Sequence, residues 1–346
     1  MKGIYDVNKT YLENADEGPF FDGEIPAIER PATKSFLGHA VSSLIGVPAG
    51  PLLNAAWIDL AGRLGFDIVT YKTIRSFAYA GNPMPNIVFV EPSTDVARRR
   101  EAAPDSIEEL SITNSFGMPS RSLDYLLHDI AKANASLREG QVMIVSVVGS
   151  PDQKEGFLED FVTTARFAKS AGAKIIEANF SCPNAGKHEG CLYMSADSVA
   201  RFTRAIATAI APTPLILKMG LFPNEAAMRK SLIAAARGGA QGVAGINTIS
   251  MRIIDQSGVP ALTGGRITSG VCGAMIREEA LGFIRSARAI IDEEKLGLTL
   301  IGCGGIMVPE HFDAFFQEGV DVAMSATGMM WNPYLAYQTH IRHRHG

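Results

Sequence analysis

The 346-residue sequence predicts an α/β fold of the (β/α)8 TIM-barrel type. Eight short runs of apolar, largely β-branched residues alternate with segments of helical periodicity, which is the pattern of repeated βα units around a parallel sheet. Each run is nearly continuous in apolar residues, as expected for strands that are buried on both faces. No GxGxxG sequence follows the first run, and eight similar units favour a closed barrel over an open, doubly wound sheet.

The expected strands and helices follow one another regularly along the chain. The strands are residues 44–50, 66–72, 142–148, 174–180, 214–218, 242–246, 298–303 and 320–326. The helices are residues 55–64, 121–136, 156–173, 196–211, 224–238, 277–293, 308–317 and 332–342. In the third of these helices, Phe157, Phe161, Ala165 and Ala168 fall on one face, as an amphipathic helix packed on a sheet requires.

Two segments depart from the repeat. Residues 1–40 form an N-terminal extension, and the connection 73–141 after the second strand is long and rich in Pro, Asn and Ser. We interpret this connection as a long loop insertion, and loops of this length in a compact domain are usually functional. Because no break in composition marks a second domain, we expect one domain over residues 1–346, with the barrel at 41–335 and a tail at 336–346.

The composition excludes several classes of partner. The net charge of -4 argues against a nucleic-acid surface, which needs an excess of Lys and Arg. The sequence contains neither an apolar leader nor a run of about 18 apolar residues, so we expect a cytoplasmic protein that does not cross a membrane. The four cysteines, Cys182, Cys191, Cys272 and Cys303, lack metal-ligand spacing, so we expect free thiols and no metal site.

Polar residues gather where the apolar runs end. In barrel enzymes the active site lies at the carboxyl ends of the strands, so these residues are the candidates for function. They are Lys72 and Thr73 after the second run, Asn179, Ser181, Cys182 and Asn184 after the fourth, Lys218 after the fifth, and Asn247 and Thr248 after the sixth. Buried polar groups need partners, so two lysines, several amides and a thiol at one rim indicate a site.

Glycine-rich turns follow the last two runs. Gly302, Gly304 and Gly305 end the seventh, and residues 325–328 (Ser-Ala-Thr-Gly) lead from the eighth into a short helix. The SGVCG run at 269–273 is expected to open a further helix. Unhindered backbone N–H groups at such turns bind anions, so the sequence predicts a phosphorylated cofactor.

An ordered set of motifs resembles the dihydroorotate dehydrogenase family over about residues 35–335. The most specific is EANFSCPN at 177–184, in which the Cys stands where the family has its Cys or Ser base. The others are YKTIR at 71–75, GNPMPN at 81–86, NSFGMP at 114–119, LILKMG at 215–220, GINTIS at 245–250, SGVCGAMIRE at 269–278 and IGCGGI at 301–306.

The resemblance implies FMN as the cofactor. Its phosphate would be bound by Gly270, Gly273, Gly304, Gly305, Ala326 and Thr327. Its other contacts would be Ala49, Gly50, Lys72, Thr73, Ser146, Asn179, Asn247, Thr248 and Cys303. Lys218 would face the N1/O2 edge of the flavin, where a cation stabilises the anion that forms on reduction.

The resemblance also implies oxidation of dihydroorotate to orotate in pyrimidine biosynthesis. The pyrimidine edges would be read by Asn114, Asn179, Asn184 and Asn247, with Thr248 beside them, because an amide offers both a donor and an acceptor. Lys72 and the backbone N–H groups of Phe116, Gly117 and Met118 would bind the carboxylate. Cys182 would remove the C5 proton while the C6 hydride passes to flavin N5, so Cys182 and Lys72 are the expected catalytic residues.

Alternatives remain open at this point. NTIS followed by DQSGVP resembles the pyrimidine-reducing domain of dihydropyrimidine dehydrogenase, which would act on dihydrouracil-type substrates. A tRNA dihydrouridine synthase is disfavoured by the acidic net charge, and a non-catalytic flavin-binding barrel by the set Cys182, Lys72 and Lys218. The electron acceptor could be fumarate or an electron-transfer partner subunit, and the family implies a homodimer.

Overall fold

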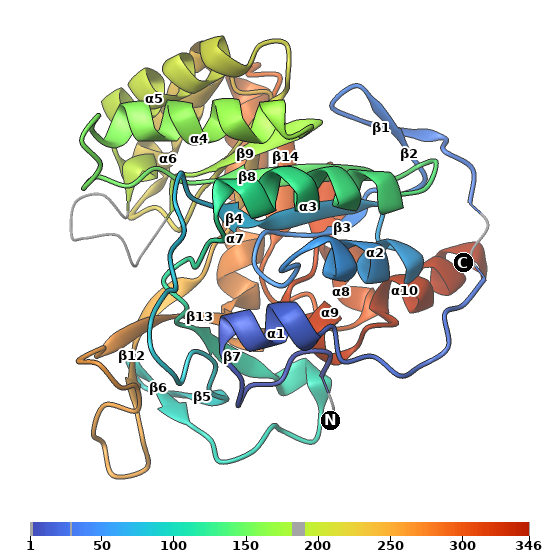
Figure 1. The fold of residues 1–346 in the computed structure, drawn as a ribbon, viewed down its shortest axis with the longest axis vertical. Helices are drawn as coiled ribbons and strands as arrows, with labels where there is room; N and C mark the ends of the chain where they lie inside the picture. Colours follow the sequence, from blue (N-terminus) through green and yellow to red (C-terminus); the bar gives the residue numbers. More distant parts are fainter. Residues whose placement is uncertain (1–2, 28–29, 182–190, 346) are drawn as a thin grey trace.

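A closed barrel of eight parallel strands forms the centre of the molecule (Figure 1). The computed structural model describes residues 3–27, 30–181 and 191–345. In barrel order the strands are β3 (Ile45–Val47), β4 (Ile68–Ile74), β8 (Val142–Val147), β9 (Ile175–Asn179), β10 (Leu215–Lys218), β11 (Gly242–Gly245), β14 (Thr299–Cys303) and β15 (Val322–Met324). Each lies within one of the eight predicted runs or overlaps it, so the predicted barrel is confirmed.

Helices cover the outside of the barrel. Seven follow successive strands and an eighth follows β15: α2 (Ala55–Arg63), α3 (Leu123–Ser136), α4 (Phe157–Ser170), α5 (Ala196–Ile210), α6 (Glu225–Gly238), α7 (Arg277–Glu293), α8 (Pro309–Gln317) and α10 (Leu335–His345). The short α9 (Thr327–Trp331) lies between β15 and α10. Of the residues expected as a tail, those from 336 to 345 are therefore helical, and α10 packs on α8.

A second sheet lies beside the barrel mouth and corrects the expected loop at 73–141. Its five strands, in the order β5 (Val90–Ser93), β6 (Val96–Arg99), β12 (Ile249–Ile254), β13 (Thr268–Gly273) and β7 (Ser111–Asn114), come from two separate connections. Three lie in the long connection after β4, and two lie between β11 and α7. The SGVCG run is thus strand β13, and the helix that it was expected to open begins later, at Arg277, after the turn η3 (Ala274–Ile276).

The N-terminal extension contributes to both ends of the barrel. The hairpin of β1 (Lys34–Phe36) and β2 (His39–Val41) places Phe36 and Val41 in the cluster that fills the barrel interior, together with Ile68 and Val142. Because Ile68 and Val142 begin their strands, this hairpin closes the amino-terminal end of the barrel. Helix α1 (Tyr11–Glu17), which begins with a capping box at Thr10, packs near the opposite end.

Connecting turns complete the described chain. Short 3-10 turns occur at η1 (Ile107–Glu109) and η2 (Leu192–Met194). Among the described helices, none combines the length and apolar character needed to cross a bilayer.

Candidate active site at the mouth of the barrel

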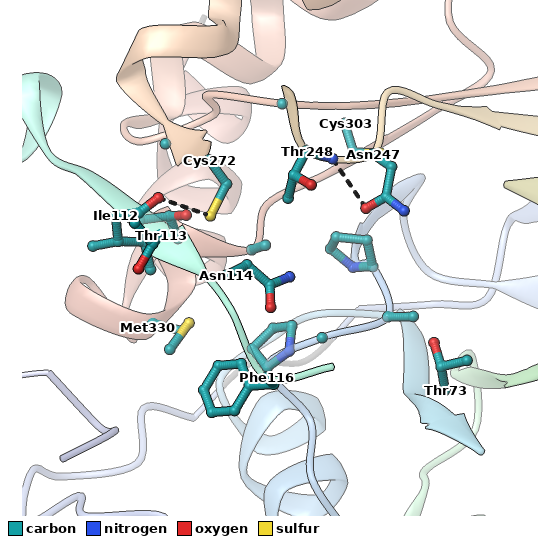
Figure 2. Close-up of a pocket in the computed structure, with 18 of the residues that line it drawn as sticks. Thr73, Ile112, Thr113, Asn114, Phe116, Asn247, Thr248, Cys272, Cys303 and Met330 are labelled. Carbon is teal, nitrogen blue, oxygen red and sulfur yellow. Dashed lines mark hydrogen bonds between the residues drawn. The ribbon is translucent and has the colours of Figure 1, made fainter. Parts of the chain in front are cut away.

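A large cavity opens at the carboxyl ends of the barrel strands (Figure 2). Together with the open solvent at its mouth, it measures about 1210 Å³. Its walls come from the strand ends, from the five-stranded sheet and from the N-terminal extension, so residues far apart in sequence meet there.

Two buried lysines point into this cavity from different strands. Lys72 on β4 is 7% exposed and Lys218 at the end of β10 is 5% exposed. The Lys218 ammonium donates to the Cys303 sulfur at 2.8 Å, and the Cys303 thiol donates to the Ile246 carbonyl at 3.1 Å. Burial raises the pKa of the Cys303 thiol, which therefore stays protonated at neutral pH and can donate in this way.

Glu177 supplies a negative charge that acts on Lys218. It lies on β9, two residues before Asn179, which pairs in register with Lys218. Burial alone would lower the pKa of Lys218, but the hydrogen bond to Cys303 and the negative charge of Glu177 outweigh burial and raise it above its ordinary value. Lys218 is thus a permanent cation beneath the cavity, although it is almost completely shielded from water.

Three asparagine side chains form a polar edge of the cavity. Asn247 Nδ2 donates to the Ser181 carbonyl and lies 3.5 Å from Asn179 Oδ1, which in turn accepts from the Ser181 N–H at 3.1 Å. The Thr248 N–H donates to Asn247 Oδ1 at 3.0 Å (Figure 2). These bonds fix the amide orientations, and Asn114 at the end of β7 brings a third amide from the five-stranded sheet.

Glycine turns line another part of the cavity. At Gly305, where φ is +76°, an added Cβ would lie 2.5 Å from the Cβ of Arg277. At Gly273, where φ is +95°, it would lie 2.3 Å from the Leu110 carbonyl oxygen. Both positions therefore need glycine for two reasons, a left-handed backbone and a close approach. Bare backbone of this kind can approach an anion closely, which suits a phosphate group.

The cavity collects most of the predicted site residues. Those on its wall are Ala49, Gly50, Lys72, Thr73, Asn114, Phe116, Gly117, Met118, Asn179, Lys218, Asn247, Thr248, Gly273, Cys303, Gly304, Gly305, Ala326 and Thr327. Two others lie off the wall of this cavity: Ser146 bonds to the Thr73 hydroxyl at 3.0 Å, and Gly270 packs against the Thr248 side chain. The predicted base Cys182 and Asn184 lie outside the described residues.

Several residues of the wall were missed from the sequence. Tyr5 and Tyr11 of the N-terminal extension reach the cavity and contact the Phe116 ring edge-on, with centroids 5.9 and 6.5 Å apart. The Tyr5 hydroxyl is buried and has no hydrogen-bond partner among the described residues. Ile112 and Met330 add apolar surface on this side (Figure 2). No motif or spacing in the sequence connects residues 5 and 11 with Phe116.

Fold and cavity together define a (β/α)8-barrel enzyme whose site combines a bare-backbone anion cradle with buried ammonium and amide groups. Comparison with known proteins places the chain within that class. A family model described as "Dihydroorotate dehydrogenase" matches residues 32–332. The chain belongs to the dihydroorotate dehydrogenase family, whose members are oxidoreductases that act on CH–CH groups.

Three relatives illustrate the breadth of the similarity. The dihydroorotate dehydrogenase of Dictyostelium discoideum is 43% identical over 359 residues, which covers 98% of this chain and 97% of the relative. The catalytic subunit of dihydroorotate dehydrogenase B (NAD(+)) of Fusobacterium nucleatum is 26% identical over 72% of this chain and 77% of its own. The NAD-dependent dihydropyrimidine dehydrogenase subunit PreA of Escherichia coli is 32% identical over 56% of this chain and 46% of its own.

Proposed function

We propose that this protein binds FMN and oxidises dihydroorotate to orotate, as a step of pyrimidine biosynthesis. The observation that carries the proposal is the meeting, in one cavity, of Lys72, Lys218, three asparagine amides and a glycine cradle. A pyrimidine that bears a carboxylate needs both a cation and amide groups, and a phosphorylated cofactor needs the cradle. Membership of the family and the near full-length relative support the same reading.

The residues of the cavity fit FMN. The backbone at Gly273, Gly304, Gly305, Ala326 and Thr327 would hold the phosphate, and the small residues Ala49 and Gly50 would leave room for the ring system. When bound, FMN supplies the acceptor for the hydride that leaves C6 of the substrate. Lys218 would present its charge to the N1/O2 edge, and its contact with Cys303 holds the ammonium at that place.

The chain's own residues would orient the substrate and move one proton. Lys72 and the N–H groups of the 116–118 turn would bind the carboxylate, while Asn114, Asn179 and Asn247 would bind the ring edges. The sequence motif adds two residues to this proposal, Cys182 as the base and Asn184 as a further amide for the ring edges. The Cys182 sulfur would accept the C5 proton, which a thiol with a reference pKa of about 8.5 can do near neutral pH.

Anaerobic reduction of the purified protein tests this function. We expect the protein to be yellow, dihydroorotate to bleach the flavin absorbance, and dihydrouracil to leave it unchanged over the same time. Bleaching by dihydrouracil alone would refute the substrate assignment. A colourless protein that gains no flavin absorbance when FMN is added would refute the cofactor assignment.

A dihydropyrimidine dehydrogenase is the second candidate function. The similarity to the PreA subunit favours it, although that relative matches over only 56% of this chain. Substrates of the dihydrouracil type carry no carboxylate, so they would leave Lys72 and the 116–118 turn without an anion. The two candidates therefore differ in one group of the substrate, and the two arms of the bleaching experiment separate them.

The electron acceptor, the oligomeric state and the compartment belong to the same proposal. The acceptor would be fumarate or an electron-transfer partner subunit, and the working form would be a cytoplasmic homodimer. An anaerobic screen of acceptors on the isolated chain distinguishes the two acceptors, because fumarate should reoxidise the flavin without any added protein. Light scattering checks the dimer.

A further inference from the structure

Every carbonyl of the turn at 115–118 accepts a hydrogen bond from a group outside the turn, on the side away from the cavity. The Ser115 carbonyl accepts from Arg266 and Asn82, each at 3.0 Å, and the Phe116 carbonyl accepts from the Asn82 N–H at 2.8 Å. Arg75 takes the next two: its Nη2 donates to the Gly117 carbonyl at 3.2 Å and its Nε to the Met118 carbonyl at 2.9 Å. Four consecutive carbonyls are thus fixed by groups outside the turn.

Fixing these carbonyls also fixes the N–H groups between them. In a trans peptide the C=O and the following N–H point in opposite directions, so a carbonyl held behind the turn directs the next N–H to the front. Phe116, Gly117 and Met118 line the cavity, and within the described chain their N–H groups donate to no protein acceptor. Gly117 and Met118 have left-handed backbones, with φ of +73° and +57°. Successive N–H groups in such a turn form an anion nest.

Arg75 is fixed by several contacts on the side of the nest that faces away from the cavity. It follows β4 directly, its Nη1 donates to the Ser150 hydroxyl at 2.7 Å, and its guanidinium lies over the Tyr79 ring at 4.8 Å from the centroid. It therefore reaches the turn with a fixed geometry and does not itself line the cavity. A cation that donates to the Gly117 carbonyl also polarises the Gly117–Met118 peptide, which strengthens the Met118 N–H as a donor.

We propose that Arg75 is a positioning residue: by holding the Gly117 carbonyl it directs the Met118 N–H of the nest toward a substrate carboxylate, and by holding the Met118 carbonyl it anchors the end of the turn. The inference deepens the proposed function and rests on it, because the anion in question is the carboxylate of orotate or dihydroorotate. It gives the YKTIR motif a second role beside that of Lys72. Lys72 contributes a charge inside the cavity, and Arg75, three residues later, positions the 116–118 turn, which would bind the same carboxylate. Binding of the carboxylate then depends on a residue that never touches it.

The test compares FMN-loaded parent protein with Arg75→Met and Arg75→Lys. We expect Arg75→Met to raise the Kd of orotate and the KM of dihydroorotate roughly 10- to 100-fold, the scale of one or two lost charge-assisted hydrogen bonds. The limiting rate of flavin reduction should stay within about threefold, because ground-state and transition-state binding of the carboxylate are lost equally. Arg75→Lys keeps a cation but loses the planar guanidinium that donates to two carbonyls at once. Its Kd for orotate should therefore lie between those of the parent and Arg75→Met.

Arg98→Met is the matched control. Arg98 also donates to two backbone carbonyls, those of Asp255 and Gln256, but these lie away from the cavity wall. The Kd of orotate and the KM of dihydroorotate should be unchanged in this variant. An unchanged orotate Kd in Arg75→Met, or a parallel loss of orotate and FMN affinity in both Arg75 variants, would overturn the positioning role. If dihydroorotate does not bleach the flavin of the parent protein, the proposed function itself is wrong, because that experiment involves no Arg75 variant.

Discussion

Buried charge is the main feature of the site at the scale of single residues. Lys218 would be costly to bury alone, and the structure provides Glu177 and the Cys303 sulfur beside it. Cys272, on the cavity wall, is another thiol of the site. Burial raises its pKa to about 11, so it stays protonated and unreactive. Position in the cavity wall alone does not make a thiol a base.

Replacing Cys182 tests the proposed base. Cys182→Ala should bind FMN and orotate like the parent, but the rate of flavin reduction by dihydroorotate should fall on the order of 10²-fold or more, because a general base is lost. Anaerobic stopped-flow absorbance measures this rate. Cys191→Ala serves as the thiol control and should reduce at the parental rate. Equal rates in Cys182→Ala and the parent would remove this thiol from the mechanism.

At the scale of elements, the barrel strands were predictable because each is a continuous apolar run, such as LILK at Leu215–Lys218. The five-stranded sheet was not, because its strands, such as VEPS at Val90–Ser93 and VARR at Val96–Arg99, mix apolar and polar residues and form no continuous apolar run. Arg252 pairs with Val96 and Gly270 with Asn114, and no local pattern carries that information. The same reason explains why β13 was expected to open a helix.

The residues of the site also fall into those that the sequence could predict and those that it could not. Strand-end residues such as Lys72 and Lys218 could be found, because a polar residue that ends an apolar run is visible in the sequence. Tyr5, Tyr11 and Arg266 could not, since they reach the site only through tertiary packing. Arg75 stood within a recognised motif, but its role depends on carbonyl directions that a sequence does not contain.

The glycine cradle allows a prediction for one element, the turn after β14. Gly305→Ala should weaken FMN binding about tenfold or more, because the methyl group meets Arg277 and the left-handed backbone costs roughly 1–2 kcal/mol. Fluorescence titration with FMN measures the Kd. Gly297→Ala is the control: its φ is also positive, at +65°, but an added Cβ meets nothing within 4 Å. If Gly297→Ala weakened FMN binding as much as Gly305→Ala, the cradle would not explain the effect.

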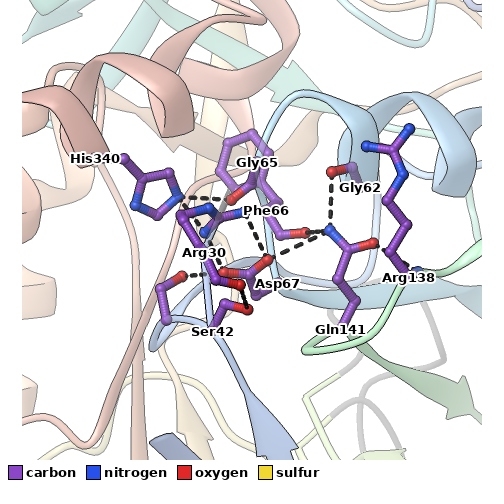
Figure 3. Close-up of polar contacts among 10 residues, drawn as sticks. Arg30, Ser42, Gly62, Gly65, Phe66, Asp67, Arg138, Gln141 and His340 are labelled. Carbon is purple, nitrogen blue, oxygen red and sulfur yellow. Dashed lines mark hydrogen bonds and ion pairs between the residues drawn. The ribbon is translucent and has the colours of Figure 1, made fainter. Parts of the chain in front are cut away.

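At the scale of the whole molecule, a polar cluster ties both ends of the chain to the amino-terminal end of the barrel (Figure 3). Asp67, just before β4, forms an ion pair with Arg30 and accepts from the Ser43 hydroxyl at 2.5 Å. His340 on α10 lies 2.7 Å from Arg30 Nη1 and 2.8 Å from the Gly65 carbonyl through its Nε2 atom. Arg30 of the extension therefore contacts both the buried Asp67 carboxylate and His340 of the last helix. Removing one partner of such a pair costs about 3–5 kcal/mol.

This cluster makes stability depend on pH. Burial, and next the charge of Arg30, lower the pKa of His340 from 6.5 to about 4. Between these values the unfolded chain binds a proton that the folded protein does not, so His340 destabilises the fold as the pH drops below 6.5. From pH 7 to pH 5 the loss should be about 2 kcal/mol. Burial raises the pKa of Asp67, so that group acts in the opposite direction.

The variant His340→Gln isolates the histidine contribution. Because glutamine does not titrate, the free energy of unfolding should fall less between pH 7 and pH 5 than it does in the parent. Urea denaturation at the two pH values measures the difference. His39→Gln, at a half-buried position on β2 outside this cluster, is the control. A parental pH slope in His340→Gln would show that this histidine does not titrate with the fold.

The proposed function places one flavin at the barrel mouth, with its phosphate at the glycine cradle and the substrate carboxylate at the 116–118 turn. A crystal structure of the protein with FMN and orotate tests this arrangement. We expect the phosphate at Gly304 and Gly305, the carboxylate at Lys72 and the N–H groups of 116–118, and the Cys182 sulfur against C5 of the ring. Orotate bound with its carboxylate away from Lys72, or with the sulfur far from the pyrimidine, would refute the proposed function.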